Sequence, residues 1–286
     1  SGMNNLFYSV WGYRPVTYPG IPLKTLVDNG YDEDVNWNND YRFNPIMSLN
    51  NEYRKRYSTY IQFNGYVQYE FMKGLRLKVS GGYTTENRRY DTFNNSKTRY
   101  GGPKSNDKVN AQRYHSERMT WLNENTLTYQ ANVKRRHYFN ALLGFSLQNS
   151  DFIDDSFSTI QIPNESLGMA GMSNGQPSTT KSGQSSWSMM SFFGRFNYNF
   201  RSKYYATATF RADGSSKFSG KNRFGYFPSG SVAWNFTEER FMKPAKSWLS
   251  NGKVRLSWGL TGNNRVGEYD TYGLMEMLKE RRGDYV

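Results

Sequence analysis

The sequence has no cysteine, which excludes disulfide bonds and thiolate chemistry. It has only two histidines, His115 and His137, and their separation argues against a histidine-based metal or catalytic centre. It also lacks any run approaching the ~20 apolar residues of a transmembrane helix, so helical spanning of a membrane is excluded. A membrane β-barrel stays open, because its signal in each strand is much weaker.

Glycine and aromatic residues are abundant instead. The 286 residues include 26 Gly, 23 Tyr, 19 Phe and 7 Trp, whereas only 36% are hydrophobic. A soluble domain of this size normally carries more Leu, Ile and Val. An apolar surface made largely of aromatic rings suits strands that show one face to an apolar medium and the other to water.

The formal net charge is +13, from 37 Lys and Arg against 24 Asp and Glu. Such an excess is typical of proteins that meet an anionic partner, such as nucleic acid or a lipopolysaccharide-like surface. Here the basic residues are spread over strand-polar positions and loops rather than gathered in one run. We interpret them as a solvated polar face and expect no nucleic-acid partner.

Apolar and polar side chains alternate most clearly between Tyr204 and Phe236. Over residues 204–213 the even positions are tyrosine, alanine and phenylalanine, and most odd positions are threonine, arginine and aspartate. Over residues 230–236 the even positions are glycine, valine, tryptophan and phenylalanine, between serine, alanine and asparagine. A period of two predicts two strands, each with one apolar and one polar face.

The same alternation predicts six further strands, at residues 60–71, 75–84, 126–133, 138–147, 190–200 and 253–261. Short connections are expected at 72–74, 134–137 and 201–203. Long polar connections are expected at 85–118 and 148–186. Connections that alternate between short and long are the layout of an outer-membrane barrel, with tight periplasmic turns and long external loops.

A soluble sandwich or barrel would also alternate, but a sandwich has little use for two connections of this length. We therefore predict an all-β fold, an antiparallel transmembrane β-barrel segment of about eight strands with long external loops. We expect a long external loop over residues 1–57, barrel strands with their loops over 58–262, and an external loop or the start of a next strand over 263–286.

Orientation gives one more expectation. If the tight turns are periplasmic, both chain ends lie outside the cell, whereas complete outer-membrane barrels keep their termini on the periplasmic side. The chain is therefore expected to be an interior, incomplete segment of a larger plugged barrel. The stretch over residues 238–252 fits less well, because it is long where a short turn is expected.

Several stretches resemble the SusC/RagA family of TonB-dependent outer-membrane transporters. They are WLNENTLTY (121–129), NALLGFS (140–146), SFFGRFNYNFRSKYYATATFRADGSSKF (191–218), NRFGYFPSGSVAWNFTEERFM (222–242) and LSNGKVRLSWGLTGNN (249–264). Their order and spacing cover most of the chain from Trp121 onward. The segment from Tyr60 to Tyr83 fits more loosely.

The resemblance implies a barrel of about 22 strands around an N-terminal plug. It also implies a SusD-like surface lipoprotein as partner, energy from the TonB complex, and the outer membrane of a Gram-negative bacterium as location. The function expected from it is import of oligosaccharides or peptides. The sequence departs from the family pattern in extent, since it shows no plug, TonB box, N-terminal extension domain or final strands.

Candidate cargo contacts are aromatic and hydrogen-bonding side chains in external loops, because ring faces and polar edges suit sugars and peptides. In the first loop these are Trp11, Tyr13, Arg14, Trp37 and Tyr41. Arg211 and Asp213 have polar-face parity near the outer rim and are expected to contact the lumen or the plug.

No catalytic residue set, metal site or cofactor is predicted, and the chain is not expected to be an enzyme. The GSSKFSGK connection (214–221) does not have the glycine spacing or the Ser/Thr of a phosphate-binding loop. Asp151, Asp154 and Asp155 could hold calcium in an external loop, but their spacing is not a recognised ligand pattern, which favours a solvated acidic loop.

Two other interpretations stay open at this point. One is a secreted β-domain that binds a glycan or a polyanion through its aromatic and basic residues. The other is a small eight-stranded barrel enzyme, which requires this segment to close by itself. An open sheet edge in lipid argues against the latter.

Overall fold

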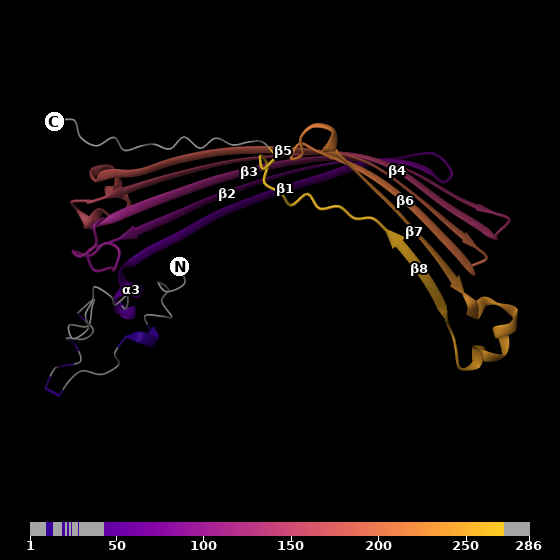
Figure 1. Cartoon of the computed structure of the whole chain (residues 1–286), viewed down its shortest axis with the longest axis horizontal. Helices are drawn as coiled ribbons and strands as arrows, with labels where there is room; N and C mark the ends of the chain where they lie inside the picture. Colours follow the sequence, from indigo (N-terminus) through magenta and orange to yellow (C-terminus); the bar gives the residue numbers. More distant parts are fainter. Residues whose placement is uncertain are drawn as a thin grey trace. The chain divides into compact units, whose positions relative to one another are not determined.

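The structure is a computed structural model that describes residues 10–13, 19–20, 22, 24, 28 and 43–271. Its main feature is a sheet of 8 strands that follow one another in sequence order (Figure 1). The strands are β1 (Glu52–Met72), β2 (Leu75–Asn94), β3 (Asn110–Val133), β4 (His137–Ile160), β5 (Gln176–Phe200), β6 (Tyr204–Ser215), β7 (Phe224–Asn235) and β8 (Lys253–Gly259). The predicted all-β, antiparallel fold is confirmed.

Within residues 43–271, helical structure is confined to short segments. An α-helix, α3 (Pro45–Asn51), precedes β1, and four 3-10 segments lie in connections: η2 (Glu165–Asn174), η3 (Gly220–Arg223), η4 (Phe236–Glu238) and η5 (Arg240–Ser247). Over the described ranges, we find no helix with the length and apolar character that crossing a membrane requires.

The tight turns lie where the sequence predicted them. Lys134 and Arg135 both have a positive φ, as do Arg201 and Ser202. Two consecutive residues in this conformation form the kind of hairpin turn whose twist matches that of the flanking strands. At the third turn, Gly74 has a φ of 90°, and its carbonyl accepts a hydrogen bond from the Gln130 amide at 2.8 Å.

The strands are longer than predicted at their other ends. β2 continues to Asn94 and β3 begins at Asn110, so the predicted connection at 85–118 was wrong at both ends. Likewise β4 continues to Ile160 and β5 begins at Gln176, within the connection predicted at 148–186. Asp151, Asp154 and Asp155 therefore lie in a strand and not in a loop.

Strand length explains the error. β5 has 25 residues, which at a rise of ~3.3 Å per residue extend over roughly 80 Å. A bilayer's hydrocarbon core is only ~30 Å thick, and a tilted strand crosses it with about 10 residues. Beyond the membrane both faces of a strand meet water, so the contrast between even and odd positions that marks a strand in the sequence disappears.

The chain divides into two compact units. The first unit comprises Ser1–Tyr60, Glu86–Glu117 and Ile153–Gln184. Its small apolar core consists of Phe93, Ala111 and Ile162, with Tyr53, Val109, Met169 and Met172 packed against it. Glu165, at the start of η2, accepts hydrogen bonds from the Ser96 amide and hydroxyl at 2.7 and 3.0 Å, which ties the two long connections of this unit together.

The second unit comprises Ile61–Thr85, Arg118–Phe152 and Ser185–Val286. Strand register fixes its two faces. Phe196 pairs with Ala208, Ala206 with Val232, and Val232 with Leu256, so these apolar side chains share one face of β5–β8, which we call the apolar face. The opposite face, with Arg211, Asp213 and the threonines of β6, is called the polar face.

The apolar face is exposed to its surroundings. Phe192, Phe196, Phe210, Val232, Trp234, Leu256 and Trp258 are all largely uncovered. A contiguous apolar surface of this kind is unfavourable in water and is expected where a sheet meets lipid. This feature favours the transmembrane interpretation over a secreted β-domain.

The stretch predicted to fit poorly, residues 238–252, belongs to a connection over residues 236–252 that has its own structure. It holds η4 and η5, and we call it the β7–β8 connection. The Glu239 carboxylate accepts hydrogen bonds from the Lys203 amino group and the Tyr204 hydroxyl, both at 2.7 Å, and from the Trp234 indole at 3.4 Å. These bonds lower the pKa of Glu239 from its ordinary 4.5 to about 2, and the bond from Lys203 has the largest effect.

This pKa predicts an acid-sensitive contact. Because the pKa is lowered on folding, the contribution of Glu239 to stability is complete above its ordinary value near 4.5 and is lost as the pH falls toward 2. We expect Glu239→Gln to lower the unfolding temperature at pH 7. The difference in unfolding temperature between variant and parent should shrink as the pH falls below 4.5. Thermal unfolding in detergent measures this difference at each pH.

A second variant provides the control. Lys203→Met should lower the unfolding temperature by a similar amount at pH 7, and the double variant should add little, because both changes remove one ion pair. A gap between Glu239→Gln and parent that is constant from pH 7 to pH 3 would contradict the ion-paired state of Glu239.

Candidate functional site

Arg211 and Asp213 form the centre of a polar site on the second unit. They lie two residues apart on β6, so both side chains stand on the polar face. The Arg211 Nε lies 2.7 and 2.8 Å from the two carboxylate oxygens of Asp213. Arg211 Nη2 donates to the buried hydroxyl of Ser191 on β5 at 3.1 Å. Three oxygen atoms from two side chains therefore fix the guanidinium in one orientation.

An aromatic ring supports the same guanidinium from β5. The Arg211 Cζ lies 5.4 Å from the centre of the Phe193 ring, within the range of a cation–π contact. The ring in turn lies over Gly144 of β4, where a Cβ atom would overlap it. Glycine in a strand interior often marks such a close approach.

Residues 260–271, which follow β8, cross the polar face; we call this segment the strap. The β7–β8 ladder ends at the pair Ser229–Gly259. The Leu260 amide still donates to the Pro228 carbonyl at 3.0 Å. Pro228 has no N–H to donate to the Leu260 carbonyl, so the second hydrogen bond of this pair cannot form and the ladder stops there. Figure 1 shows the chain leaving the tip of β8 and running on across the sheet.

The strap lies directly on the sheet. A Cβ atom at Gly262 would overlap the ring of Phe227, a polar-face residue of β7. Further along, the Asn264 amide nitrogen lies 3.7 Å from the Met189 sulfur of β5. Glycine at 262 is therefore what permits the close approach.

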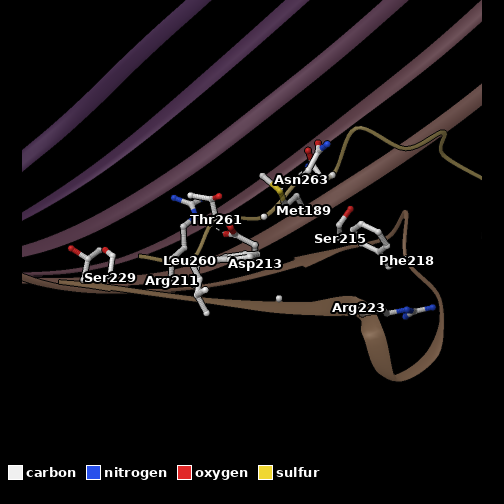
Figure 2. A pocket seen from close by; sticks show the side chains of 15 residues that line it. Met189, Arg211, Asp213, Ser215, Phe218, Arg223, Ser229, Leu260, Thr261 and Asn263 are labelled. Atoms are coloured by element: carbon white, nitrogen blue, oxygen red, sulfur yellow. Dashed lines mark hydrogen bonds and ion pairs between the residues drawn. The ribbon is translucent and has the colours of Figure 1, made fainter. Parts of the chain in front are cut away.

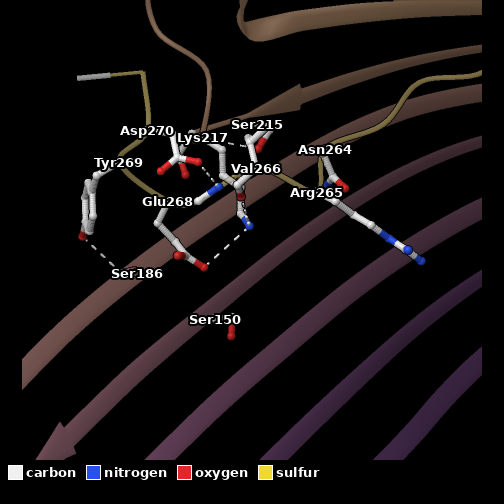
Figure 3. Close-up of polar contacts among 12 residues, drawn as sticks. Ser150, Ser186, Ser215, Lys217, Asn264, Arg265, Val266, Glu268, Tyr269 and Asp270 are labelled. Atoms are coloured by element: carbon white, nitrogen blue, oxygen red, sulfur yellow. Dashed lines mark hydrogen bonds and ion pairs between the residues drawn. The ribbon is translucent and has the colours of Figure 1, made fainter. Parts of the chain in front are cut away.

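Lys217, in the β6–β7 connection, holds the far half of the strap (Figure 3). Its amino group donates to the Val266 carbonyl at 3.1 Å and lies 3.6 Å from the Glu268 carboxylate. Its carbonyl accepts from the Thr271 hydroxyl at 3.1 Å. The side chain is only 13% exposed, and its amino group lies 5.4 Å from the centre of the Trp187 ring.

The strap and the polar face enclose a pocket of about 620 Å³ (Figure 2). Arg211, Asp213 and Thr261 lie close together in it, and Arg223 lies at its far end. The aromatic rings of Phe218 and Phe227 and the amides of Asn263 and Asn264 complete its lining. Ligand pockets are typically about 300–1,000 Å³ and combine apolar surface with a few polar groups. The chemistry here suits a neutral ligand rich in hydroxyl or amide groups.

Comparison with known proteins identifies the kind of protein to which this site belongs. No family model matches the chain. The chain is 33% identical over 246 residues to the TonB-dependent receptor P3 of Formosa agariphila and 30% identical over 254 residues to receptor P26 of that organism. These alignments cover 84% and 86% of this chain. Over 97 residues it is 45% identical to the TonB-dependent receptor SusC of Bacteroides thetaiotaomicron, which covers 34% of this chain and 10% of SusC.

The chain belongs to the SusC/RagA family of TonB-dependent receptors. It spans about a quarter of the length of the curated relatives, 24% of receptor P3 and 25% of receptor P26. The family resemblance found in the sequence is confirmed.

Solved structures agree on the fold. The RagAB peptide transporter matches with a TM-score of 0.70 at 23% identity, over 81% of this chain and 26% of that chain. The RagAB peptide importer in its open-open state matches with a TM-score of 0.71, also at 23% identity, over 81% of this chain and 25% of that chain. The eight strands therefore have the arrangement of a SusC/RagA barrel wall.

Of the five candidate cargo contacts in the N-terminal region of this SusC/RagA chain, the structure describes two. Trp11 is 89% exposed, and Tyr13 is half-buried. Arg14, Trp37 and Tyr41 lie outside the described residues. Over the part of the chain that the structure describes, no three His, Cys, Asp or Glu side chains come together in a way that could hold a metal ion.

Sequence reasoning missed the strap and its contacts. Lys217 was noted only as part of a rejected phosphate loop, and no sequence signal connects it with Glu268. Gly262 directly follows the strand that alternation predicts at 253–261, and nothing in the stretch LSNGKVRLSWGLTGNN indicates a crossing. Pro228 was the available signal, since proline inside a strand marks a place where pairing stops.

The strap contacts predict a local change that can be measured. We expect Lys217→Met to raise deuterium exchange across residues 264–271, because a charge-assisted hydrogen bond of about 1–3 kcal/mol is lost. That loss corresponds to an exchange rate at least several-fold higher. Gly262→Val should raise exchange over 260–264 by lifting the chain from Phe227.

Lys73→Gln is the matched control, because Lys73 is an exposed lysine in the β1–β2 turn. Exchange mass spectrometry on the purified chain should show no change in the strap for this variant. Equal exchange in Lys217→Met and in the parent would contradict the fastening role of Lys217.

Proposed function

We propose that this chain is part of an outer-membrane importer that takes up oligosaccharides or peptides with energy from the TonB complex. A SusD-like surface lipoprotein is its proposed partner. Family membership supports this, because the relatives are named TonB-dependent receptors and the matching solved structures are titled a peptide transporter or importer. It acts in transport, not in catalysis.

The two-faced sheet is the observation that carries the proposal. The apolar face of β5–β8 is stable only against lipid, whereas the polar face lines a space that contains water. A pocket with hydrogen-bonding groups and aromatic rings lies on that polar face. A wall with lipid on one side and a polar pocket on the other is what passage of a hydrophilic cargo through a membrane requires.

The pocket chemistry narrows the cargo to hydrophilic, largely neutral groups. Arg211 and Asp213 neutralise each other and offer hydrogen bonds without a strong net field, while Arg223 adds one positive charge at the far end of the pocket. Sugar hydroxyls and peptide amides both suit such groups, while Phe218 and Phe227 provide faces for a sugar ring or an apolar side chain. Trp11 is the proposed aromatic contact in the N-terminal region, because its ring is almost fully exposed.

A growth experiment in the native bacterium tests the proposed function. Strains lacking this gene, the gene of the proposed SusD-like lipoprotein or tonB are grown on oligosaccharide mixtures and on peptide mixtures as sole nutrient. All three deletions should abolish uptake of the same cargo class. Unchanged growth and accumulation on every mixture in the strain lacking this gene would overturn the proposal.

A steric variant tests the pocket within that function. Thr261→Phe should fill the pocket and reduce cargo uptake by roughly tenfold, the effect of about 1.4 kcal/mol of lost binding. Ser257→Phe is the control, because Ser257 stands on the polar face of β8 but not in the pocket. Uptake of labelled cargo by cells with equal amounts of each variant in the outer membrane measures the difference. Equal uptake by both variants would place the cargo route elsewhere.

A further inference from the structure

The β7–β8 connection is attached to the lipid side of the wall. Glu239 binds the Tyr204 hydroxyl and the Trp234 indole, and the pair Tyr204–Trp234 belongs to the apolar face. The Phe241 ring centre lies 6.5 Å from that of Trp234. The pocket, by contrast, lies on the polar face. The connection therefore lies beside the lipid-facing ends of β6 and β7.

Two large aromatic side chains of this connection are uncovered. Phe241 is 66% exposed and Trp248 is 77% exposed. In water, this exposure of two rings seven positions apart would be unfavourable. Tryptophan is enriched at membrane–water boundaries, because its ring is apolar and its N–H needs a polar partner.

The charge of the connection matches the headgroup layer. Residues 238–253 contain four basic residues, Arg240, Lys243, Lys246 and Lys253, and two acidic ones, Glu238 and Glu239. Glu239 is already paired with Lys203 at 2.7 Å. Arg240 and Lys243 are both exposed. Basic side chains next to exposed aromatic ones are the composition of segments that lie in the interface of a membrane.

We infer that the β7–β8 connection is a phospholipid-binding anchor at the membrane surface on the side of the tight turns. Phe241 and Trp248 insert among the upper acyl chains, and Arg240 and Lys243 bind lipid phosphates. Glu239 fixes the anchor to the wall through Lys203, Tyr204 and Trp234. The bound partner is bilayer phospholipid, and the binding does not depend on which cargo the receptor carries.

Spin-label accessibility tests the position of this anchor. The intact receptor, with any cysteine outside these 286 residues replaced, receives one label at Ser247→Cys and, as control, one at Asn106→Cys, an exposed position in the β2–β3 connection. Both are placed in nanodiscs of equal parts phosphatidylethanolamine and phosphatidylglycerol. We expect the label at 247 to collide readily with oxygen and poorly with a water-soluble nickel chelate, and the label at 106 to show the reverse.

Two pairs of substitutions separate the apolar and the charged contributions. Phe241→Ser with Trp248→Ser should move the label at 247 into water in every lipid. In the parent, we expect the label at 247 to lie deeper in nanodiscs of phosphatidylglycerol than in nanodiscs of phosphatidylcholine. Arg240→Gln with Lys243→Gln should abolish this difference and leave the label near the membrane surface. Thermal unfolding in detergent confirms that each variant is folded.

Two results would overturn the inference. One is a label at 247 as accessible to the nickel chelate as the label at 106. The other is a label shielded from both reagents, which indicates that protein and not lipid covers the connection.

Discussion

A strand that crosses lipid must find partners for its backbone groups within the sheet, because the hydrocarbon provides none. The ladder of β5–β8 meets this need with consecutive antiparallel pairs, and its register then puts every second side chain into lipid. The remaining features follow from that one requirement. The apolar face is aromatic and exposed, and the polar face is left to carry the pocket. Chain that no longer pairs must leave the lipid, either across the polar face or along the membrane surface.

The sequence predicts the part of each strand that lies in the membrane, because only there do the two faces meet different media. This is why 204–213 and 253–261 were recognised, with an end error of two residues in each case. It cannot predict β4 beyond residue 147 or β5 before residue 190 by the same rule. In those stretches the structure continues the ladder with serine, threonine and aspartate on both sides.

The sequence predicts one part of the site, the face on which Arg211 and Asp213 stand, but not the contacts of the strap. The parity of Arg211 and Asp213 placed them on the polar face, since alternation on one strand is a local property. The contact between Lys217 and Glu268 joins residues 51 positions apart through a side chain and a segment without regular structure. No period or motif encodes such a pair. Those contacts depend on where the chain goes once pairing stops, which only the fold determines.

Pro228 lacks an amide hydrogen, and the path of the twelve residues of the strap depends on that absence. Toward β6 the pair Phe210–Pro228 stays in register, but toward β8, where its carbonyl accepts from the Leu260 amide, the ladder cannot continue past it. A proline two residues earlier along β7 would let β8 pair for longer and release less chain across the polar face, and one two residues later would release more. The position of one residue in the wall therefore decides how much chain lies on the polar face, and with it the size of the pocket that the strap borders.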